Sequence, residues 1–257
     1  MDYIEHTING RIGIITLNRP EKRNALSFEL VSALKEAFTS FENDPRVKII
    51  ILNARGQVFC AGADLEYLQK LQRFSHDENL ADSNHLKALL LLIYTLKKLV
   101  VAQVQGHALA GGCGLVSVCD FVFAVPEAKF GYTEVKIGFI PAVVMTFLLR
   151  KIGEARAKQL LLSGDLVQAE EAFRLGIVNK VVNSQDLEKE VMDFALRLSN
   201  ENSQEAMMVT KQMVAQVQSM PLLDALNYAS EMNAKARATE DCKKGIQAFL
   251  NKEKIVW

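Results

Sequence analysis

The sequence has no excess of charge, no long apolar run and no paired cysteine motif. Its 257 residues carry 30 basic and 30 acidic side chains, which gives a formal net charge of zero. A neutral chain without a basic block gives no electrostatic reason to expect nucleic acid or an anionic membrane as a partner. The longest apolar run, residues 88–94, is far shorter than the roughly 20 residues that a membrane helix needs. We therefore expect neither a membrane span nor a nucleic-acid partner.

The cysteines and the start of the chain point to a reducing compartment. The four cysteines, Cys60, Cys113, Cys119 and Cys242, form no Cys-x-x-Cys pair, and most lie in apolar sequence. We interpret them as buried small side chains rather than catalytic groups. The first residues show no basic segment followed by an apolar one, so we expect no signal peptide. A cytoplasmic location follows as a prediction.

The sequence also has no motif for binding a metal or a nucleotide phosphate. The four histidines form no His-x-x-x-His pair and no cluster with cysteine, so we expect no metal site. There is no Gly-x-x-x-x-Gly-Lys-Ser/Thr motif, and the glycine-rich stretch does not match Gly-x-Gly-x-x-Gly. These absences make metal-dependent and nucleotide-phosphate chemistry poor first hypotheses.

The sequence does contain an alternation of strand and helix patterns. Asn9-Gly10 lies between two runs of β-forming residues, 3–8 and 12–17, and predicts a hairpin. Ser27 can cap the helix that follows. Apolar spacings of three and four predict that the inner face of this helix carries Leu30, Leu34, Phe38 and Phe41. Residues 47–52 then predict a buried strand, and the order strand, helix, strand favours parallel pairing.

The next segment repeats the sequence of strand, glycine-containing loop and helix. Residues 53–65 form the loop, which leads into a short helix. Residues 72–84 are polar and charged, so we expect a mobile excursion near a site entrance there. A helix over about 86–98 is expected to follow.

One glycine-rich stretch, residues 105–120, lies between strand patterns at 99–102 and 121–124, with helical character from about Gly112. A strand that passes through a glycine turn into a buried helix leaves backbone N–H groups without partners, and small side chains let a ligand approach them. Such a site can hold a phosphate or a developing oxyanion. Close packing of a helix on a strand would use the same glycines, so both interpretations stay open.

Several ordered motifs resemble those of the crotonase (enoyl-CoA hydratase/isomerase) superfamily. The matching segments are 59–65 (FCAGADL), 104–120, 128–134 (AKFGYTE), 137–141 (IGFIP), 162–165 (LSGD), 169–172 and 176–178 (GIV). The resemblance covers nearly the whole chain. It is specific for the superfamily and much less specific for the reaction.

The resemblance implies an α/β fold, a crotonase-like spiral of ββα units with a C-terminal helical region. The spiral core with the acyl-CoA site would span 1–195, and the region at 196–257 would serve oligomerisation as a homotrimer or a dimer of trimers. The backbone N–H groups of Ala63 and Gly111 would form an oxyanion hole for the thioester of an acyl-CoA. No separate cofactor is expected, because coenzyme A is part of the substrate.

The resemblance also identifies Glu134 as the catalytic acid and base. Apolar residues on both sides of Glu134 predict partial burial, and a carboxylate removed from water has a raised pKa. The alternative from the residues alone is a surface glutamate paired with Lys136.

This sequence departs from the hydratases of the superfamily at Gly114, where they have a second glutamate. One carboxylate could still support a one-base hydration or a double-bond shift between C2 and C4. We expect Gly114 to leave empty volume that admits a branched or carboxylated acyl chain. After Pro141 the usual glycine-rich run is replaced by residues 142–147 (AVVMTF), which would reshape the wall of the acyl pocket. Both changes resemble the branch that handles methylglutaconyl-type or 3-hydroxy-3-methylglutaryl-type thioesters, and ordinary drift is the alternative.

The superfamily match also places a set of residues along coenzyme A. Backbone groups would hold the pantetheine. Lys22 would meet a phosphate of coenzyme A, and Lys252 would reach a phosphate from a neighbouring subunit. The residues are Lys22, Asn24, Ala25, Ala61, Asp64, Leu65 and Lys252.

Three functional hypotheses follow from these residues. The first is an enoyl-CoA hydratase, a lyase that adds water to an enoyl-CoA or removes it. The second is a Δ3,Δ2-enoyl-CoA isomerase that uses the same residues. The third is a non-catalytic homologue that binds an acyl-CoA or RNA, in which Glu134 would be dispensable.

Overall fold

The predicted hairpin forms one edge of a six-stranded sheet. In the computed structural model, which describes residues 3–257, β1 (Ile4–Asn9) pairs antiparallel with β2 (Ile12–Leu17). Gly10 takes a φ of +58° in the turn, a backbone conformation that favours glycine. The other strands run parallel in the order β2, β3 (Ile49–Ala54), β4 (Leu99–Val104), β6 (Phe121–Ala124) and β9 (Lys180–Val181). The expected parallel pairing is confirmed.

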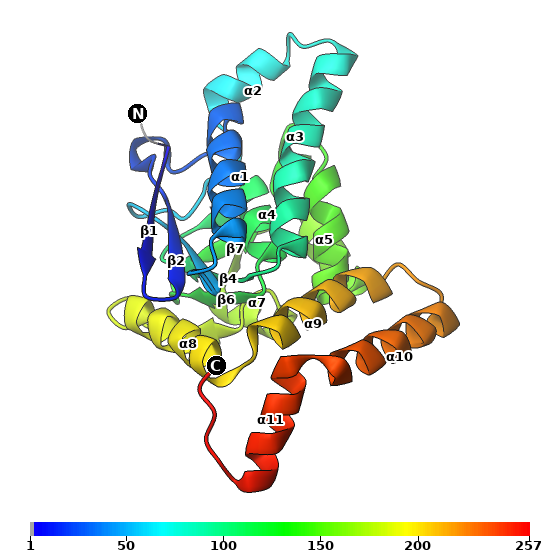
Figure 1. Ribbon diagram of the computed structural model, residues 1–257. Helices are drawn as coiled ribbons and strands as arrows, with labels where there is room; N and C mark the ends of the chain where they lie inside the picture. Colours follow the sequence, from blue (N-terminus) through cyan, green and yellow to red (C-terminus); the bar gives the residue numbers. More distant parts are fainter. Residues whose placement is uncertain (1–2) are drawn as a thin grey trace.

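A second, smaller sheet accompanies the large one. It consists of β5 (Ala108–Leu109), β7 (Lys129–Gly131) and β8 (Val167–Gln168). Two isolated parallel bridges extend this small sheet. Cys60 pairs with Ala108 of β5, and Leu26 pairs with Ala63. The chain therefore passes repeatedly from a strand of the large sheet to a short extended segment of the small one and then to a helix (Figure 1). This arrangement is the predicted spiral of ββα units.

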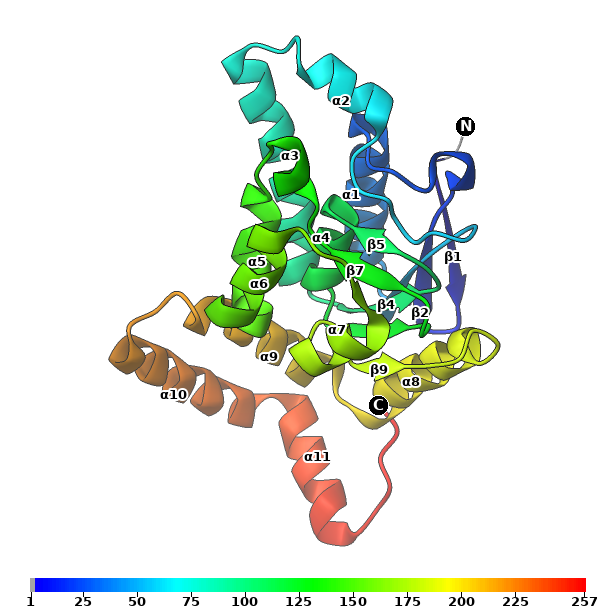
Figure 2. The same cartoon turned by 180° about the vertical axis from the view of Figure 1, so that it is seen from behind.

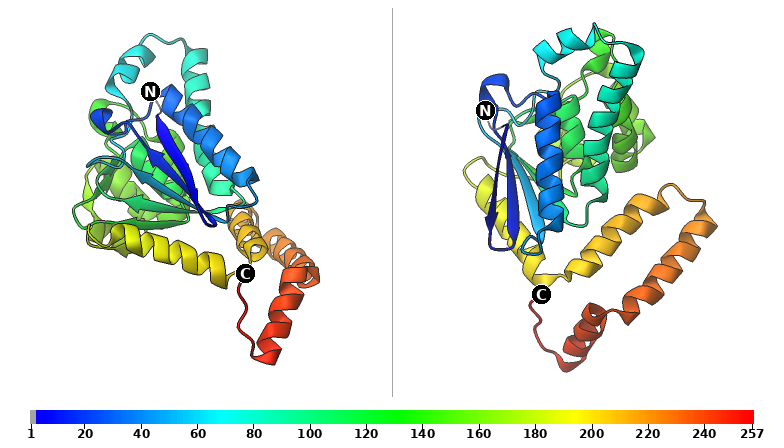
Figure 3. Two further views of the ribbon diagram at one scale, coloured as in Figure 1. Left: turned by 60° about the vertical axis from the view of Figure 1, so that its left-hand side comes forward. Right: turned by 45° about the horizontal axis from the view of Figure 1, so that its top comes forward.

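Helix α1 (Phe28–Asn43) forms as its apolar spacing predicts. The Ser27 hydroxyl accepts a hydrogen bond from the Leu30 N–H, which satisfies one donor of the first turn. The apolar residues of its inner face are all buried: Leu30, Leu34, Phe38 and Phe41. Helix α1 lies beside α3 on the same side of the molecule (Figures 1 and 3).

The expectation of a mobile excursion at 72–84 is wrong for most of that segment. Helix α3 spans His76–Thr95. It is preceded in the chain by the 3₁₀ turn η1 (Pro20–Lys22), by α1 and by the short helix α2 (Leu65–Leu71). Ser75 and Glu78 form a capping box, in which each side chain accepts the backbone N–H of the other residue. This cap explains why a polar segment starts a helix about ten residues earlier than apolar periodicity indicates.

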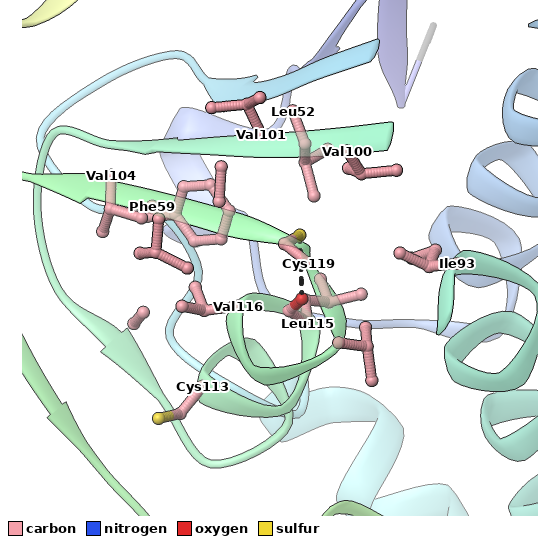
Figure 4. Close-up of a cluster of buried hydrophobic side chains, with 14 of the residues drawn as sticks. Leu52, Phe59, Ile93, Val100, Val101, Val104, Cys113, Leu115, Val116 and Cys119 are labelled. Carbon is pink, nitrogen blue, oxygen red and sulfur yellow. Dashed lines mark hydrogen bonds between the residues drawn. The ribbon is translucent and has the colours of Figure 1, made fainter. Parts of the chain in front are cut away.

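Helix α4 (Gly111–Val118) is buried and lies at the centre of the core. Figure 4 shows its Cys113 and Val116 among apolar side chains from neighbouring elements. Burial raises the pKa of Cys60 and Cys119 to about 12 and that of Cys113 to about 11. At neutral pH these three thiols are uncharged, so their interpretation as small buried side chains is confirmed. For Cys242 the expected burial is wrong, because this residue of α11 is only partly buried.

The remaining helices follow in chain order. After 3₁₀ turn η2 (Glu134–Ile137) come α5 (Ala142–Ile152), α6 (Glu154–Ser163), α7 (Ala169–Leu175), α8 (Leu187–Glu201), α9 (Gln204–Val217), α10 (Leu222–Ala238) and α11 (Glu240–Asn251). Helix α8 packs on the large sheet, so the expected domain boundary at residue 195 falls inside a helix. Figure 2 shows α10 and α11 extending from the side of the molecule opposite to α2. No residue of α10 is buried.

A buried lysine ties α9 to the central sheet. The Lys211 ammonium donates to the Asp120 carboxylate at 2.7 Å and to the carbonyl oxygens of Ile93 and Lys98 at 3.0 Å. The same carboxylate oxygen, Oδ2 of Asp120, also accepts the Val100 N–H at 2.7 Å. One ion pair thus joins the end of α3, the start of β4 and helix α9.

We predict that Lys211→Met lowers the free energy of unfolding by about 3–5 kcal/mol, because it leaves a buried carboxylate without its partner. Denaturant unfolding of purified protein measures this loss. Lys235→Met is the control, since Lys235 makes a fully exposed pair with Glu231, and solvent screens such a pair so that its loss changes stability little. Equal stabilities of the two variants would contradict the role given to Lys211.

Candidate active site

A strained turn aims the first backbone donor of the site. Ala110 precedes α4 with φ +49° and ψ −121°, a conformation that side-chain-bearing residues rarely adopt. Its N–H donates to the Gly131 carbonyl of β7 at 2.8 Å, which holds the turn in place. Gly111 follows directly, and its N–H donates to no protein acceptor within residues 3–257. The chain thus maintains a free donor at the helix start.

The second donor lies in the loop between β3 and α2. On either side of Ala63, the Leu26 N–H donates to the Gly62 carbonyl at 2.7 Å and the Asp64 N–H donates to the Leu26 carbonyl at 2.9 Å. These bonds fix the backbone around Ala63 without using its own N–H. Across the described chain, this N–H has no protein acceptor either.

Contacts between the two turns bring Ala63 and Gly111 together. The Leu109 N–H donates to the Cys60 carbonyl at 2.9 Å, and the Cys60 N–H donates to the His107 carbonyl at 3.1 Å. A Cβ atom on Gly62 would lie only 2.9 Å from the Cβ of Ala110, so the two backbones touch there. Ala63 directly follows Gly62, and Gly111 directly follows Ala110, so this contact brings the two free N–H groups near each other. The geometry supports the paired donors that the sequence predicts.

Glu134 contributes a partly buried carboxyl group at the start of η2. Its Oε2 atom is buried and has no hydrogen-bond partner among the described residues. Burial raises the pKa of Glu134, and a backbone hydrogen bond lowers it by a smaller amount. Burial raises the pKa of Cys113 in α4 and of Tyr132, which follows β7, and the charge of Glu134 adds a smaller rise to both. Glu134 itself follows three residues after Gly131, whose carbonyl accepts the Ala110 N–H at the start of α4.

The alternative in which Glu134 pairs with Lys136 is wrong. Lys136 instead approaches Asp165, with 3.6 Å between the ammonium nitrogen and the nearer carboxylate oxygen. Glu134 thus keeps an unsatisfied buried oxygen. An unpartnered buried acceptor is unfavourable, and its occurrence favours a site for a ligand.

The expectation of empty volume at Gly114 is also wrong. A Cβ atom at residue 114 would lie 2.3 Å from Cγ1 and 3.1 Å from Cβ of Val144 in α5. The space beside Gly114 is therefore filled by a side chain of the segment that replaces the glycine-rich run. Pro141 lies just before α5 and is buried, and its carbonyl accepts the Met145 N–H at 2.9 Å.

Asn24 is committed to the protein rather than free to contact a ligand. Its side-chain amide accepts the Arg19 N–H at 2.8 Å and donates to the carbonyls of Arg55 and Val58 at 2.9 and 2.8 Å. Asn24 is completely buried and has a φ of +52°. It connects the loop after β2 with the loop after β3.

Asp64 has a similar structural role. Its carboxylate accepts the N–H groups of Glu66 and Tyr67, which caps α2, and pairs with Arg19 at 3.2 Å. The N–H groups of Ala25 and Ala61 also donate within the loop, to the carbonyls of Lys22 and Arg23. Contacts of these residues with a pantetheine would therefore have to use their carbonyl oxygens.

The remaining candidates are exposed. Lys22 forms an ion pair with Glu66, and that pair raises the pKa of its ammonium group. Leu65 is 77% exposed at the start of α2. Lys252 ends α11 and lies at the opposite end of this chain from α2 (Figures 1 and 2). Within one chain, Lys252 is therefore not brought together with the other candidates.

Sequence reasoning missed two groups that shape the site. Arg19 bonds to Asp64 and to the Ala25 carbonyl, and so holds the loop that precedes α1 against the start of α2. Val144 fills the space beside Gly114. No local pattern signals either contact, because each joins segments that are distant in the sequence.

Among residues 3–257 there is no group of three or more His, Cys, Asp or Glu placed to hold a metal ion. The same residues contain no helix with the length and apolar character to span a membrane.

Comparison with known proteins decides the family. The model of the enoyl-CoA hydratase/isomerase family matches residues 7–257. The chain belongs to this family. A crotonyl-CoA hydratase of Syntrophomonas wolfei is 36% identical over 95% of the chain and 93% of that protein. A mitochondrial enoyl-CoA hydratase of Pongo abelii is 33% identical over 96% of the chain and 83% of that protein.

The fold agrees with this family membership. A solved structure of an enoyl-CoA hydratase from Mycobacterium smegmatis superimposes with a TM-score of 0.93 and 29% identity, covering 99% of this chain and 98% of the other. The spiral core and the C-terminal helical region are therefore shared with the family.

We predict that Asn24→Ala lowers the free energy of unfolding by about 2–4 kcal/mol, because two carbonyls and one N–H lose a buried partner. Thermal or denaturant unfolding measures this effect. Asn43→Ala serves as the matched control, since the Asn43 amide makes one exposed bond to the Thr39 carbonyl. An Asn24→Ala protein as stable as the control would show that this amide does not hold the two loops together.

Proposed function

We propose that the protein is an enoyl-CoA hydratase, which reversibly adds water across the double bond of a 2-enoyl-CoA thioester. The observation that carries the proposal is the buried, unpartnered Oε2 of Glu134, three residues after Gly131, whose carbonyl accepts the Ala110 N–H next to the free N–H of Gly111. The hydratase names of the relatives support the same reaction class. Exposed apolar side chains close to Glu134, those of Ile137, Phe139 and Ile140, offer an apolar surface to a ligand.

The two free donors activate the thioester. If its carbonyl oxygen accepts the N–H groups of Ala63 and Gly111, electron density moves from the double bond toward that oxygen and C3 becomes electrophilic. The developing enolate then meets two donors that are already in place. One such donor typically stabilises a transition state by about 3–4 kcal/mol.

Glu134 moves the proton in this proposal. As a carboxylate it takes a proton from water while the water oxygen bonds to C3. The electron pair of the double bond passes to the thioester oxygen. As the enolate collapses, Glu134 returns a proton to C2. A raised pKa suits this cycle, because the carboxyl group must both accept and donate a proton.

Isomerisation is the second candidate, and the single carboxylate favours it. With Gly114 in α4, no second carboxylate lies at the family position that accompanies hydration. Glu134 alone could move a proton between C4 and C2 through the same stabilised enolate. The products distinguish the two reactions, because hydration yields a 3-hydroxyacyl-CoA and isomerisation adds no oxygen.

Coenzyme A recognition and assembly complete the proposal. Lys22 meets a phosphate after separating from Glu66, and Lys252 reaches a coenzyme A bound to a neighbouring copy. Helices α10 and α11 expose large apolar side chains that association would cover, including those of Leu222, Leu223, Leu226, Phe249 and Leu250. These features support a homotrimer or a dimer of trimers. We also propose a cytoplasmic location on the basis of the reduced cysteines.

The acyl chain is the least constrained part. The filled space beside Gly114 removes the geometric argument for a branched chain at that point. A methylglutaconyl-type substrate therefore rests on the resemblance of residues 142–147 to that branch of the family.

We predict that Glu134→Gln lowers kcat for crotonyl-CoA hydration by about 10³-fold and changes KM little, because glutamine cannot accept or deliver the proton. Loss of the conjugated enoyl-thioester absorbance measures the rate. Glu127→Gln is the control, because Glu127 is exposed just before β7. Retention of full activity by Glu134→Gln would favour a non-catalytic homologue or a different base.

The raised pKa of Glu134 also predicts a pH dependence. Hydration requires the carboxylate, so kcat/KM should rise with pH through an ionisation above the ordinary range of glutamate and then level off. Initial rates over a pH series check this expectation. A rise of kcat/KM with an apparent pKa at or below the ordinary value of glutamate would contradict the burial of Glu134 in the free enzyme.

A further inference from the structure

Two unusual residues of the site occupy one space. Gly114 lies three residues after Gly111 on α4, so the two share a helix face. Val144 lies in the first turn of α5, which packs against α4. The position that a Cβ atom of residue 114 would take is 2.3 Å from Val144 Cγ1 and 3.9 Å from Leu90 Cδ1. No side chain can be added at residue 114 unless Val144 moves.

Val144 has little freedom to move. A β-branched residue in a helix strongly prefers one χ1 rotamer, so its methyl group cannot rotate away at low cost. Val144 is also buried, with 3% of its surface exposed. This sequence differs from the hydratases of the superfamily at Gly114 and at residues 142–147. These two differences are thus one structural exchange, in which a side chain from α5 replaces a side chain from α4.

We propose that Val144 is a reaction- and specificity-determining residue, which seals the α4 side of the site with an apolar wall and leaves Glu134 as its only carboxylate. This inference rests on the proposed hydratase function and goes beyond it. The wall consists of Val144 and Leu90, so that side of the site has no charge to fix a water or a carboxylated acyl group. Glu134 takes a proton from the attacking water and returns that proton to C2. Hydrogen and hydroxyl from one water then add to the same face of the double bond.

The neighbours of Glu134 are uncharged or paired. Burial raises the pKa of Cys113 in α4 to about 11, and it raises the pKa of Tyr132, two residues before Glu134, well above its usual value. Lys136 of η2 pairs with Asp165. Cys113 and Tyr132 are therefore uncharged at neutral pH, which leaves Glu134 as the carboxyl group that the proposed cycle uses.

The first experiment tests the steric exchange. Thermal unfolding is compared for the wild type, Gly114→Ala, Val144→Ala and the double variant. Gly114→Ala should lower Tm by roughly 4–8 °C, because its methyl group overlaps the Val144 side chain. In the double variant this added loss should disappear, since Val144→Ala removes the overlapping methyl group. Additive losses in Tm would overturn the proposal.

The second experiment tests the catalytic consequence. Val144→Gly with Gly114→Glu vacates the space and supplies a second carboxylate, and its pH profile for kcat is compared with those of the wild type and of Val144→Gly. The double variant should gain a second ionisation, whereas the other two should show one. Two ionisations in the wild type, or a second ionisation produced by Val144→Gly alone, would overturn the proposal. The alanine cycle remains decisive if the glutamate variant does not fold.

The outcome also separates this inference from the proposed function. A wild-type protein that hydrates crotonyl-CoA but shows additive Tm losses retains the hydratase function and loses the role of Val144. A wild-type protein that shows coupled Tm losses but no turnover of any enoyl-CoA retains the steric exchange and loses the hydratase function.

Discussion

The close approach of two backbone turns is the constraint on which the site depends. Gly62 lies so close to Ala110 that a Cβ atom on Gly62 would be only 2.9 Å from the Ala110 Cβ. The residue after each turn presents an N–H that the protein leaves free. Glycine makes the first turn inexpensive, whereas Ala110 adopts a strained conformation that costs about 1–3 kcal/mol. The strain is retained because the hydrogen bond to Gly131 and the packing of α4 fix the turn.

The same layer positions the proton-transfer group. Strand β7 pairs with β5 through Phe130 and Gly131, and Glu134 follows only a few residues later. The rigid pairing therefore fixes the distance between the donor turn and the carboxyl group. Glu134 lies outside the large sheet, where partial burial raises its pKa but leaves the group accessible to a ligand. Donor geometry and acid strength thus both follow from the second, smaller sheet.

Local signals in the sequence predict much of the fold. Asn9-Gly10 and the apolar spacing after Ser27 are enough to predict the hairpin and α1, because turn chemistry and periodicity act over short distances. Apolar periodicity places the start of α3 too late in the sequence. The capping box of Ser75 and Glu78 starts the helix earlier, although the first turns have few apolar residues. Family resemblance, rather than local pattern, led to Ala63, Gly111 and Glu134.

The errors at the site have a common physical origin. The sequence indicates which residues are small or charged but not which distant segment approaches them. Gly114 alone predicts an opening, but Val144 from α5 fills that space, and Lys136 is a possible partner for Glu134 in the sequence but lies beside Asp165 in the structure. Asn24 suggested a ligand contact, but all of its hydrogen bonds serve two neighbouring loops.

The most direct test of the central claim is a crystal structure of the protein with an unreactive acyl-CoA thioester. The account predicts that the thioester oxygen lies about 3 Å from the backbone nitrogens of both Ala63 and Gly111, with the Glu134 carboxyl group beside the adjacent carbon atoms. A thioester oxygen bound elsewhere, with both amides still unoccupied, would contradict it.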